Sequence, residues 1–251
     1  MYIQSIGSGL TSFGDLFNDF LASCTDGEIY LLFSSLVPTL PADKPKRLTN
    51  LEKSQFILSD ELKEILVGLI LGDLNLDKQP TNVRLRFKQG IVNKDYLMHL
   101  YEIFSGYCPS GPKFTNAAPD KRTGIVYTGL YFNTYSLPCF NALYNLFYIG
   151  GVKIVPSNIF ELLTPLGLAY FICDDGSFAK SNNIFKFCTE NFTESDIDLL
   201  IQVLENKFNL KCRKEKRGKG FRIAIKRSSL GTLRELVCPH LHSSMLYKLG
   251  L

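Results

Sequence analysis

The sequence lacks long apolar runs and paired cysteines, and each absence excludes a class of protein. The apolar run at residues 65–71 is far shorter than the roughly 20 residues that cross a bilayer, so no membrane partner is expected. Acids interrupt the first 40 positions, so we also expect no secretory signal. The seven cysteines are scattered without a CxxC pair and indicate free thiols in a reducing compartment. The CPHLH segment at 238–242 lacks the second cluster that a zinc site needs.

Basic residues are concentrated in two segments of a chain whose net charge is only +4. Residues 207–234 hold eleven Lys or Arg against one acid, and residues 84–153 hold eight against three. Two basic segments on an otherwise balanced chain favour a polyanionic partner such as nucleic acid, although a solvated charged surface gives the same pattern. With 251 residues, 45% of them apolar, the chain can form one large core or two fused smaller ones.

The order of expected elements repeats along the chain after a proline-rich linker. Prolines 38, 41 and 45 break any regular element, and the residues before them form an extension of unknown purpose. The first half predicts helices at 59–72, 93–106 and 137–150, a strand at 82–90 and a hairpin at 124–134. The second half predicts helices at 164–176, 193–208 and 228–237, a strand at 183–190 and a hairpin at 210–227. We therefore expect an extension at 1–50, a first repeat at 51–152 and a second repeat at 153–251.

Each half contains an apolar helix that ends in an aspartate, Asp73 in the first half and Asp175 in the second. A carboxylate is disfavoured at a helix C-terminus, and parallel packing of the two helices through Gly68 and Gly72 would also bring the acids together. A divalent cation removes both costs, since Mg²⁺ prefers carboxylate, carbonyl, water and phosphate oxygens. Either acid alone also fits an exposed turn. Two copies, 102 positions apart in the same context, favour the metal site.

The segments LVGLILGDL at 66–74 and LAYFICDDG at 168–176 resemble the motif of the LAGLIDADG homing endonucleases in their monomeric two-motif form. The resemblance covers residues 50–251 and is closest to the yeast mitochondrial intron-encoded subgroup. LTPLGLAYFICDDGS and MLYKLG are its most specific stretches. It implies an α+β fold of two pseudo-symmetric αββαββα repeats that form a saddle. The motif helices then lie at the pseudo-dyad, and antiparallel sheets line the DNA major groove.

The resemblance also implies which residues form the site. The metal-binding residues that the resemblance implies are Asp73 and Asp175 through their side chains, and Gly72 and Asp174 through their backbone carbonyls. Its basic catalytic residues are Lys153 and Lys248, which position the attacking water or stabilise phosphate charge. The implied cofactor is Mg²⁺ or Mn²⁺. Two positions depart from the motif: Tyr170 replaces a glycine, which predicts a ring packed where the first copy has Gly68, and Leu74 replaces the glycine after the first acid.

The implied function is hydrolysis of one phosphodiester bond in each strand of double-stranded DNA, at a long and partly asymmetric target site, without a covalent intermediate. The residues chosen for DNA contact are Arg84, Arg86, Lys88, Lys186, Arg222 and Lys226. Each of them fits a phosphate or solvent contact as well as base readout. An RNA-binding intron maturase on the same fold is the main alternative, with intron RNA as its partner, and an inactive DNA-binding relic is the third. We expect a monomer in an organelle, with the mitochondrion preferred to the chloroplast.

Overall fold

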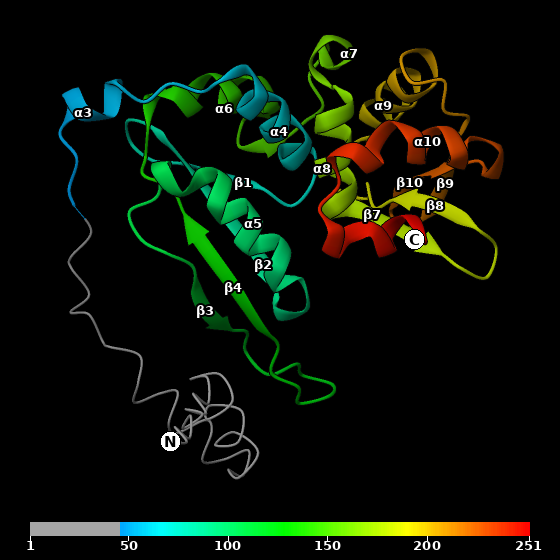
Figure 1. Cartoon of the computed structure of the whole chain (residues 1–251), viewed down its shortest axis with the longest axis horizontal. Coiled ribbons are helices and arrows are strands. Elements are labelled where there is room, and N and C mark those ends of the chain that lie inside the picture. Colours follow the sequence, from blue (N-terminus) through cyan, green and yellow to red (C-terminus); the bar gives the residue numbers. More distant parts are fainter. Residues whose placement is uncertain (1–45) are drawn as a thin grey trace, which may run out of the picture. The chain divides into compact units, whose positions relative to one another are not determined.

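Two four-stranded antiparallel sheets flank a central pair of helices in residues 46–251, which are the residues that the computed structural model describes (Figure 1). The strand order is β1-β2-β4-β3 in the first sheet and β7-β8-β10-β9 in the second. The same order in both halves confirms the predicted α+β class and its duplicated pattern. The linker prolines, and the extension before them, lie outside the described residues.

The helices and strands follow the predicted order closely. The first half contains α3 (Asn50–Ser54), α4 (Asp60–Leu71), β1 (Asn75–Lys78), β2 (Val83–Gly90), α5 (Lys94–Phe104), β3 (Lys113–Asn116), β4 (Thr128–Asn133) and α6 (Asn141–Phe147). A small hairpin follows, made of β5 (Tyr148–Ile149) and β6 (Val152–Lys153). The second half contains α7 (Ile159–Leu162), α8 (Pro165–Asp175), β7 (Gly176–Ala179), β8 (Ile184–Phe187), α9 (Glu194–Asn206), β9 (Cys212–Arg217), β10 (Gly220–Ile225), α10 (Leu230–Val237) and the 3₁₀ helix η6 (Ser243–Leu249). No helix among residues 46–251 is long and apolar enough to span a membrane.

Local capping residues set where the long helices begin. The Ser59 hydroxyl accepts the backbone N–H of Leu62 at the start of α4, and the Thr164 hydroxyl accepts that of Gly167 at the start of α8. The side chain of Thr193 forms a capping box at the start of α9. These contacts satisfy N–H groups that have no partner within the helix, and they confirm the predicted helix starts.

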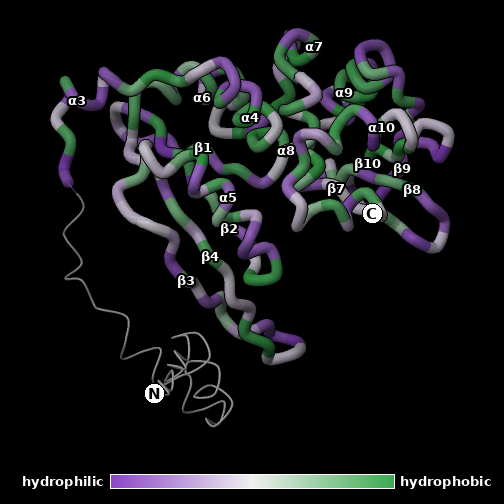
Figure 2. The backbone as a smooth tube through the Cα atoms, in the orientation of Figure 1, coloured by the Kyte–Doolittle hydropathy of each residue, from purple (hydrophilic) through white to green (hydrophobic). Residues whose placement is uncertain are grey.

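The two sheets turn one face to the core and one face to solvent, because apolar and basic residues alternate along strands such as β2. In β2, Val83, Leu85 and Phe87 are buried, and the Phe87 ring stacks on that of Phe132 in β4 at 4.4 Å. Apolar residues of α5 cover this face of the first sheet, and α9 covers the second. In Figure 2 the hydrophobic colour gathers where the helices α4 and α8 lie. Each sheet therefore leaves its opposite face, with the basic residues, open.

Two predicted elements of the first half were wrong in part. The hairpin predicted at 124–134 contains only β4, which pairs with β3 across the long loop 117–127. Asp120 forms a tight turn in that loop by accepting the N–H groups of Arg122 and Thr123, so the strand that pairs with β4 lies further upstream. The helix predicted at 137–150 is shortened to α6, because Gly150 and Gly151 adopt positive φ angles and form the β5–β6 turn.

The helices α4 and α8 pack against each other in parallel through glycines. The Thr164 hydroxyl donates to Glu64 at 2.7 Å near their starts, and Gly72 contacts Asp174 at their ends. Midway, an added Cβ on Gly68 would lie 1.9 Å from the Gly167 carbonyl oxygen, so the backbones touch there. The close approach to Gly68 is therefore made by Gly167 and not by Tyr170.

Replacing Gly68 with Ala should destabilise the protein because the new methyl group would overlap the backbone of α8, which cannot move aside as a side chain can. We expect a loss of about 1–3 kcal/mol or more in the free energy of unfolding, measured by urea denaturation. Gly231→Ala is the matched control, since Gly231 lies in helix α10 with open space around it. That control should be neutral or slightly stabilising. Equal stability of the two variants would contradict close helix packing at Gly68.

Candidate active site

The two predicted acids lie at the same end of the paired helices and line one cavity. Asp73 follows α4 and is exposed, whereas Asp175 is the last residue of α8 and is partly buried. Both line a cavity of about 360 Å³, together with Lys153. The parallel packing of α4 and α8 thus brings together two carboxylates that are far apart in the sequence.

Burial and mutual repulsion raise the pKa values of the acids in the second motif. Burial, and then the charge of Asp73, raise the pKa of Asp175 to about 7. The same two causes raise the pKa of Asp174 well above its ordinary range. Negative charge is therefore costly at this end of the helices, which is the condition that a bound cation relieves.

Two lysines bind the backbone at the helix ends in corresponding ways. Lys153 Nζ donates to the carbonyls of Gly72 at 2.8 Å and Leu74 at 3.2 Å, and Lys248 Nζ donates to that of Asp174 at 2.6 Å. Burial lowers the pKa of Lys153, and the nearby acids act in the opposite direction. The lysines thus occupy the two carbonyls that were predicted to assist the metal, and a metal on the same oxygens would lie beside an ammonium group.

The hairpin β5–β6 carries Lys153 to the site. Tyr148 lies opposite Lys153 in its register, and the Tyr148 hydroxyl accepts the N–H of Leu76 at 3.4 Å. One face of the hairpin is therefore fixed to the turn after α4. The opposite face presents Ile149 and Val152, which are 65% and 63% exposed.

Gln89 is a site residue that the sequence interpretation missed. It lies on the core side of β2, in line with the buried residues 83, 85 and 87. Its Nε2 lies 3.4 Å from Asp73 Oδ2 and 3.2 Å from Asp174 Oδ1, so it contacts both motifs. A polar residue that continued an apolar row was the available signal for this contact.

The open face of the first sheet forms a large hollow. A cavity of about 860 Å³ is lined by Asp73 at one end and by Arg86 and Lys88 of β2. Arg84 lies on the same face but forms an ion pair with Asp77 at 2.5 Å. Lys88 has no carboxylate partner among residues 46–251, so its charge is available to a ligand.

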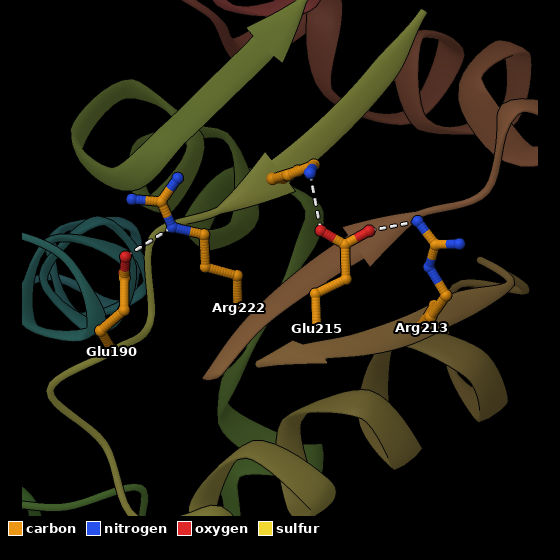
Figure 3. A network of polar contacts seen from close by, with 5 residues as sticks. Glu190, Arg213, Glu215 and Arg222 are labelled. Carbon is orange, nitrogen blue, oxygen red and sulfur yellow. Dashed lines mark hydrogen bonds and ion pairs between the residues drawn. The ribbon is translucent and has the colours of Figure 1, made fainter. Parts of the chain in front are cut away.

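Three basic residues on the open face of the second sheet are held in ion pairs. Arg222 pairs with Glu190 at 2.5 Å, and Lys186 and Arg213 both pair with Glu215 (Figure 3). Two of the predicted DNA contacts, Lys186 and Arg222, are thus already held by acids. Lys226 instead lines a smaller hollow of about 210 Å³.

That smaller hollow also contains Arg213 and Arg227, which the sequence interpretation did not single out. Ala224 lies on the open face, between Arg213 and Lys186 in the strand register, but is only 2% exposed. The long side chains of its cross-strand neighbours Lys186 and Arg213 account for this burial.

Residues 63–233 match the model of the LAGLIDADG DNA endonuclease family. The chain belongs to this family. The match includes most of α4 and all of α8, both acids, Lys153 and both sheets, and it ends before Lys248.

The relatives of this LAGLIDADG protein include both maturases and endonucleases. The cytochrome b mRNA maturase bI2 of Saccharomyces cerevisiae is 32% identical over 206 residues, which cover 77% of this chain and 48% of that protein. The DNA endonuclease I-ChuI of Chlamydomonas applanata is 30% identical over 209 residues, which cover 77% of this chain and 96% of that protein. The chain therefore spans about half the length of the yeast maturase but almost all of I-ChuI.

A solved LAGLIDADG structure has the same fold. The homing endonuclease I-WcaI bound to its DNA recognition sequence superimposes with a TM-score of 0.72 and 27% identity, covering 77% of this chain and 88% of that chain. The likeness extends over both halves.

The donor atoms at the LAGLIDADG helix ends fit a hard divalent cation. Among residues 46–251, no group of three or more His, Cys, Asp or Glu side chains forms a ready metal cluster. A cation between Asp73 and Asp175 would therefore complete its coordination with carbonyl, water or phosphate oxygens. This donor set suits Mg²⁺, which is usually held by one or two carboxylates and substrate oxygens.

Replacing Asp175 with Asn should change how the stability of the metal-free protein depends on pH. Because the folded pKa of about 7 lies above the ordinary value of 3.8, the folded protein binds this proton more tightly than the unfolded chain does. The parent therefore loses stability as pH rises from about 4 to about 7. We expect the variant to gain stability relative to the parent over this window, measured by urea denaturation in EDTA.

Asp60→Asn is the control for this measurement and should give the opposite sign. The hydrogen bond and charge of Lys63 lower the pKa of the exposed Asp60, so its stabilising effect is lost as pH falls. A flat difference between Asp175→Asn and the parent from about pH 4 to pH 7 would contradict the raised pKa of Asp175.

Proposed function

We propose that this LAGLIDADG protein is a site-specific homing endonuclease that hydrolyses one phosphodiester bond in each strand of double-stranded DNA. The observation that supports this most directly is the shared cavity of Asp73 and Asp175 at the ends of two parallel helices. The cavity opens beside a basic sheet face, so a nucleic-acid backbone on that face would reach the acids. The endonuclease relatives agree with this assignment.

The residues of the site have separate tasks in this reaction. Asp73 and Asp175 would hold Mg²⁺ or Mn²⁺, which when bound polarises a phosphate and lowers the pKa of a water. Lys153 and Lys248 place positive charge beside the helix ends and stabilise charge that develops on the phosphate. The Gln89 amide holds the first carboxylate in place. The carbonyls of Gly72 and Asp174 stay candidate ligands.

Binding would come mainly from the open faces of the two sheets. Arg86 and Lys88 line the large hollow beside Asp73, and Lys226, directly after β10, lines the smaller hollow of the second sheet. Arg84, Lys186 and Arg222 would exchange their carboxylate partners for phosphate or a base edge. Phosphate contacts of this kind give affinity that falls as salt increases.

A second candidate function is supported by the maturase relatives. Besides the yeast protein, the cytochrome b mRNA maturase bI2 of Debaryomyces hansenii is 30% identical over 200 residues. An RNA-binding maturase would use the same basic surface without needing Asp73 and Asp175 for cleavage. Intron RNA is therefore the alternative partner, and binding to RNA without DNA cleavage would favour it over the endonuclease.

The two repeats, 51–152 and 153–251, each supply one acid, so a single chain completes the site without a second copy. We therefore propose a monomer. Because the relatives include cytochrome b mRNA maturases, we also propose a mitochondrial location, with the chloroplast as the alternative.

Asp73→Asn and Asp175→Asn should each abolish DNA cleavage while DNA binding is kept. Loss of a charged metal ligand should lower the cleavage rate by about 10³-fold or more, since such ligands support several kcal/mol of transition-state stabilisation. The measurement is double-strand cleavage, with Mg²⁺, of a plasmid that carries the uninterrupted exon junction of the host gene. Asp60→Asn, at the opposite end of α4, should cut normally. Cleavage retained by both variants would refute the assigned acids. If the parent protein does not cut DNA, the remaining candidate functions are the maturase and the inactive relic.

Lys88→Gln should weaken DNA binding and reduce its salt dependence. Lys88 is exposed on the large hollow, so we expect the slope of log Kd against log salt to fall by about 1, as loss of one phosphate contact predicts. Fluorescence anisotropy over a range of salt concentrations measures this slope. Lys63→Gln is the matched control, because Lys63 lies on α4 and pairs with Asp60 away from this hollow. The same slope for both variants would show that this face does not bind phosphate.

A further inference from the structure

The second motif carries an additional acid, Asp174, whose side chain reaches across the helix interface into the first half. Its Oδ2 accepts the backbone N–H of Asp73 at 3.1 Å, and its Oδ1 accepts a hydrogen bond from the Gln89 amide at 3.2 Å. The same amide lies 3.4 Å from Asp73 Oδ2. Asp174 is only 9% exposed, so a buried carboxylate anchors this network around the first acid.

Among residues 46–251, the side chain of the second acid, Asp175, has no equivalent network. The residue in the first motif that corresponds to Asp174 is Gly72, which has no side chain that could reach Asp175. An added Cβ on Gly72 would lie 2.5 Å from the Cβ of Asp174 and 2.8 Å from its Oδ2. The space across the interface is therefore filled from one side only, and the two motifs cannot both carry such an acid.

Gln89 also has no equivalent in the second half. The strand registers pair Arg86 with Asn75 and Lys186 with Ser177. Asn75 lies two positions after Asp73 and Ser177 two positions after Asp175, so Arg86 and Lys186 are equivalent positions. Three residues further along each strand, the equivalent positions are Gln89 and Thr189. The Thr189 hydroxyl donates to the Phe221 carbonyl at 2.9 Å, so it is engaged within the second sheet.

The orientation of Gln89 is fixed from behind. The Asn93 side chain donates to Gln89 Oε1 at 3.1 Å, which leaves the Nε2 of Gln89 directed at the two acids. The Tyr247 hydroxyl in turn lies 3.4 Å from Asn93 Oδ1. A chain of hydrogen bonds thus runs from the C-terminal η6 helix to the carboxylate of Asp73.

We propose that the Asp174 side chain is a positioning residue for Asp73 and makes the two halves of the site unequal. It anchors the Asp73 backbone and the Gln89 amide, so the first carboxylate is held across the interface, whereas Asp175 is held by its own helix. This inference rests on the proposed endonuclease function. Because a small misplacement of a reacting group slows a reaction strongly, loss of Asp174 should slow the cutting of one strand more than that of the other.

The first test compares strand cleavage in the full-length parent, Asp174→Ala and Asp174→Asn. The DNA is a supercoiled plasmid with the host-gene exon junction, in which each strand is labelled separately. We expect Asp174→Ala to slow one strand about tenfold or more relative to the other, so that nicked circles accumulate. Asp174→Asn should restore much of the lost rate, because its amide oxygen can still accept the Asp73 N–H.

Two further variants separate this role from a general loss of structure. Gln89→Ala removes the side chain that donates to the Asp73 carboxylate, and should slow the same strand as Asp174→Ala. Thr189→Val, its counterpart in the second half, should show no strand bias. Equal slowing of both strands by a folded Asp174→Ala protein would overturn the proposal.

The second test needs neither DNA nor cleavage, and so it distinguishes failure of this inference from failure of the proposed function. Hydrogen exchange of the Asp73 amide is followed by NMR in protein labelled with ¹⁵N-aspartate. The amide should be protected in the parent and in Asp174→Asn, and should exchange at least about tenfold faster in Asp174→Ala. Unchanged protection in Asp174→Ala would overturn the proposal even if the parent cuts DNA. A parent that fails to cut but shows this pattern would reject the endonuclease and keep the positioning contact.

Discussion

The backbone contact between Gly68 and Gly167 is the constraint on which the rest of the structure depends. It allows α4 and α8 to pack in parallel without intervening side chains, and parallel packing places both helix C-termini at one end of the interface. The two sheets extend from those ends, since β1 and β7 begin within two residues of Asp73 and Asp175. The acids and the two open basic faces are therefore positioned by one helix pair.

The same packing concentrates negative charge where the helix dipoles are also negative. Lysine ammonium groups on the carbonyls of Gly72 and Asp174, and the amide of Gln89 beside the carboxylates, offset part of this charge. These contacts leave the pKa of Asp175 still raised to about 7. Negative charge on Asp175 therefore stays costly in the folded chain, and the proposed cation would relieve that cost.

Local features made much of this fold predictable from the sequence. The helix starts at Ser59, Thr164 and Thr193 follow from capping side chains, which act over a few residues, and the predicted helix ranges began there. The alternation in β2 is equally local and sets which face of that strand is open. Contacts between distant segments were not predictable. The partner of β4, the approach of Gly167 and the reach of Gln89 to Asp174 all depend on how elements pack, and no local pattern specifies them. The family resemblance named both acids and lysines but gave no bonding for Lys153 and Lys248.

The hairpin β5–β6 limits how freely the two halves can be exchanged. Lys153 lies at the end of the connecting segment, yet its ammonium binds the turn of the first half at Gly72. A hybrid protein joined between residues 152 and 153 would take this lysine from the second parent and its anchoring Tyr148 from the first. Such hybrids are better joined after Pro156, because Tyr148 and Lys153 then come from the same parent. The segment that connects the two repeats is thus also part of the candidate site in the first repeat.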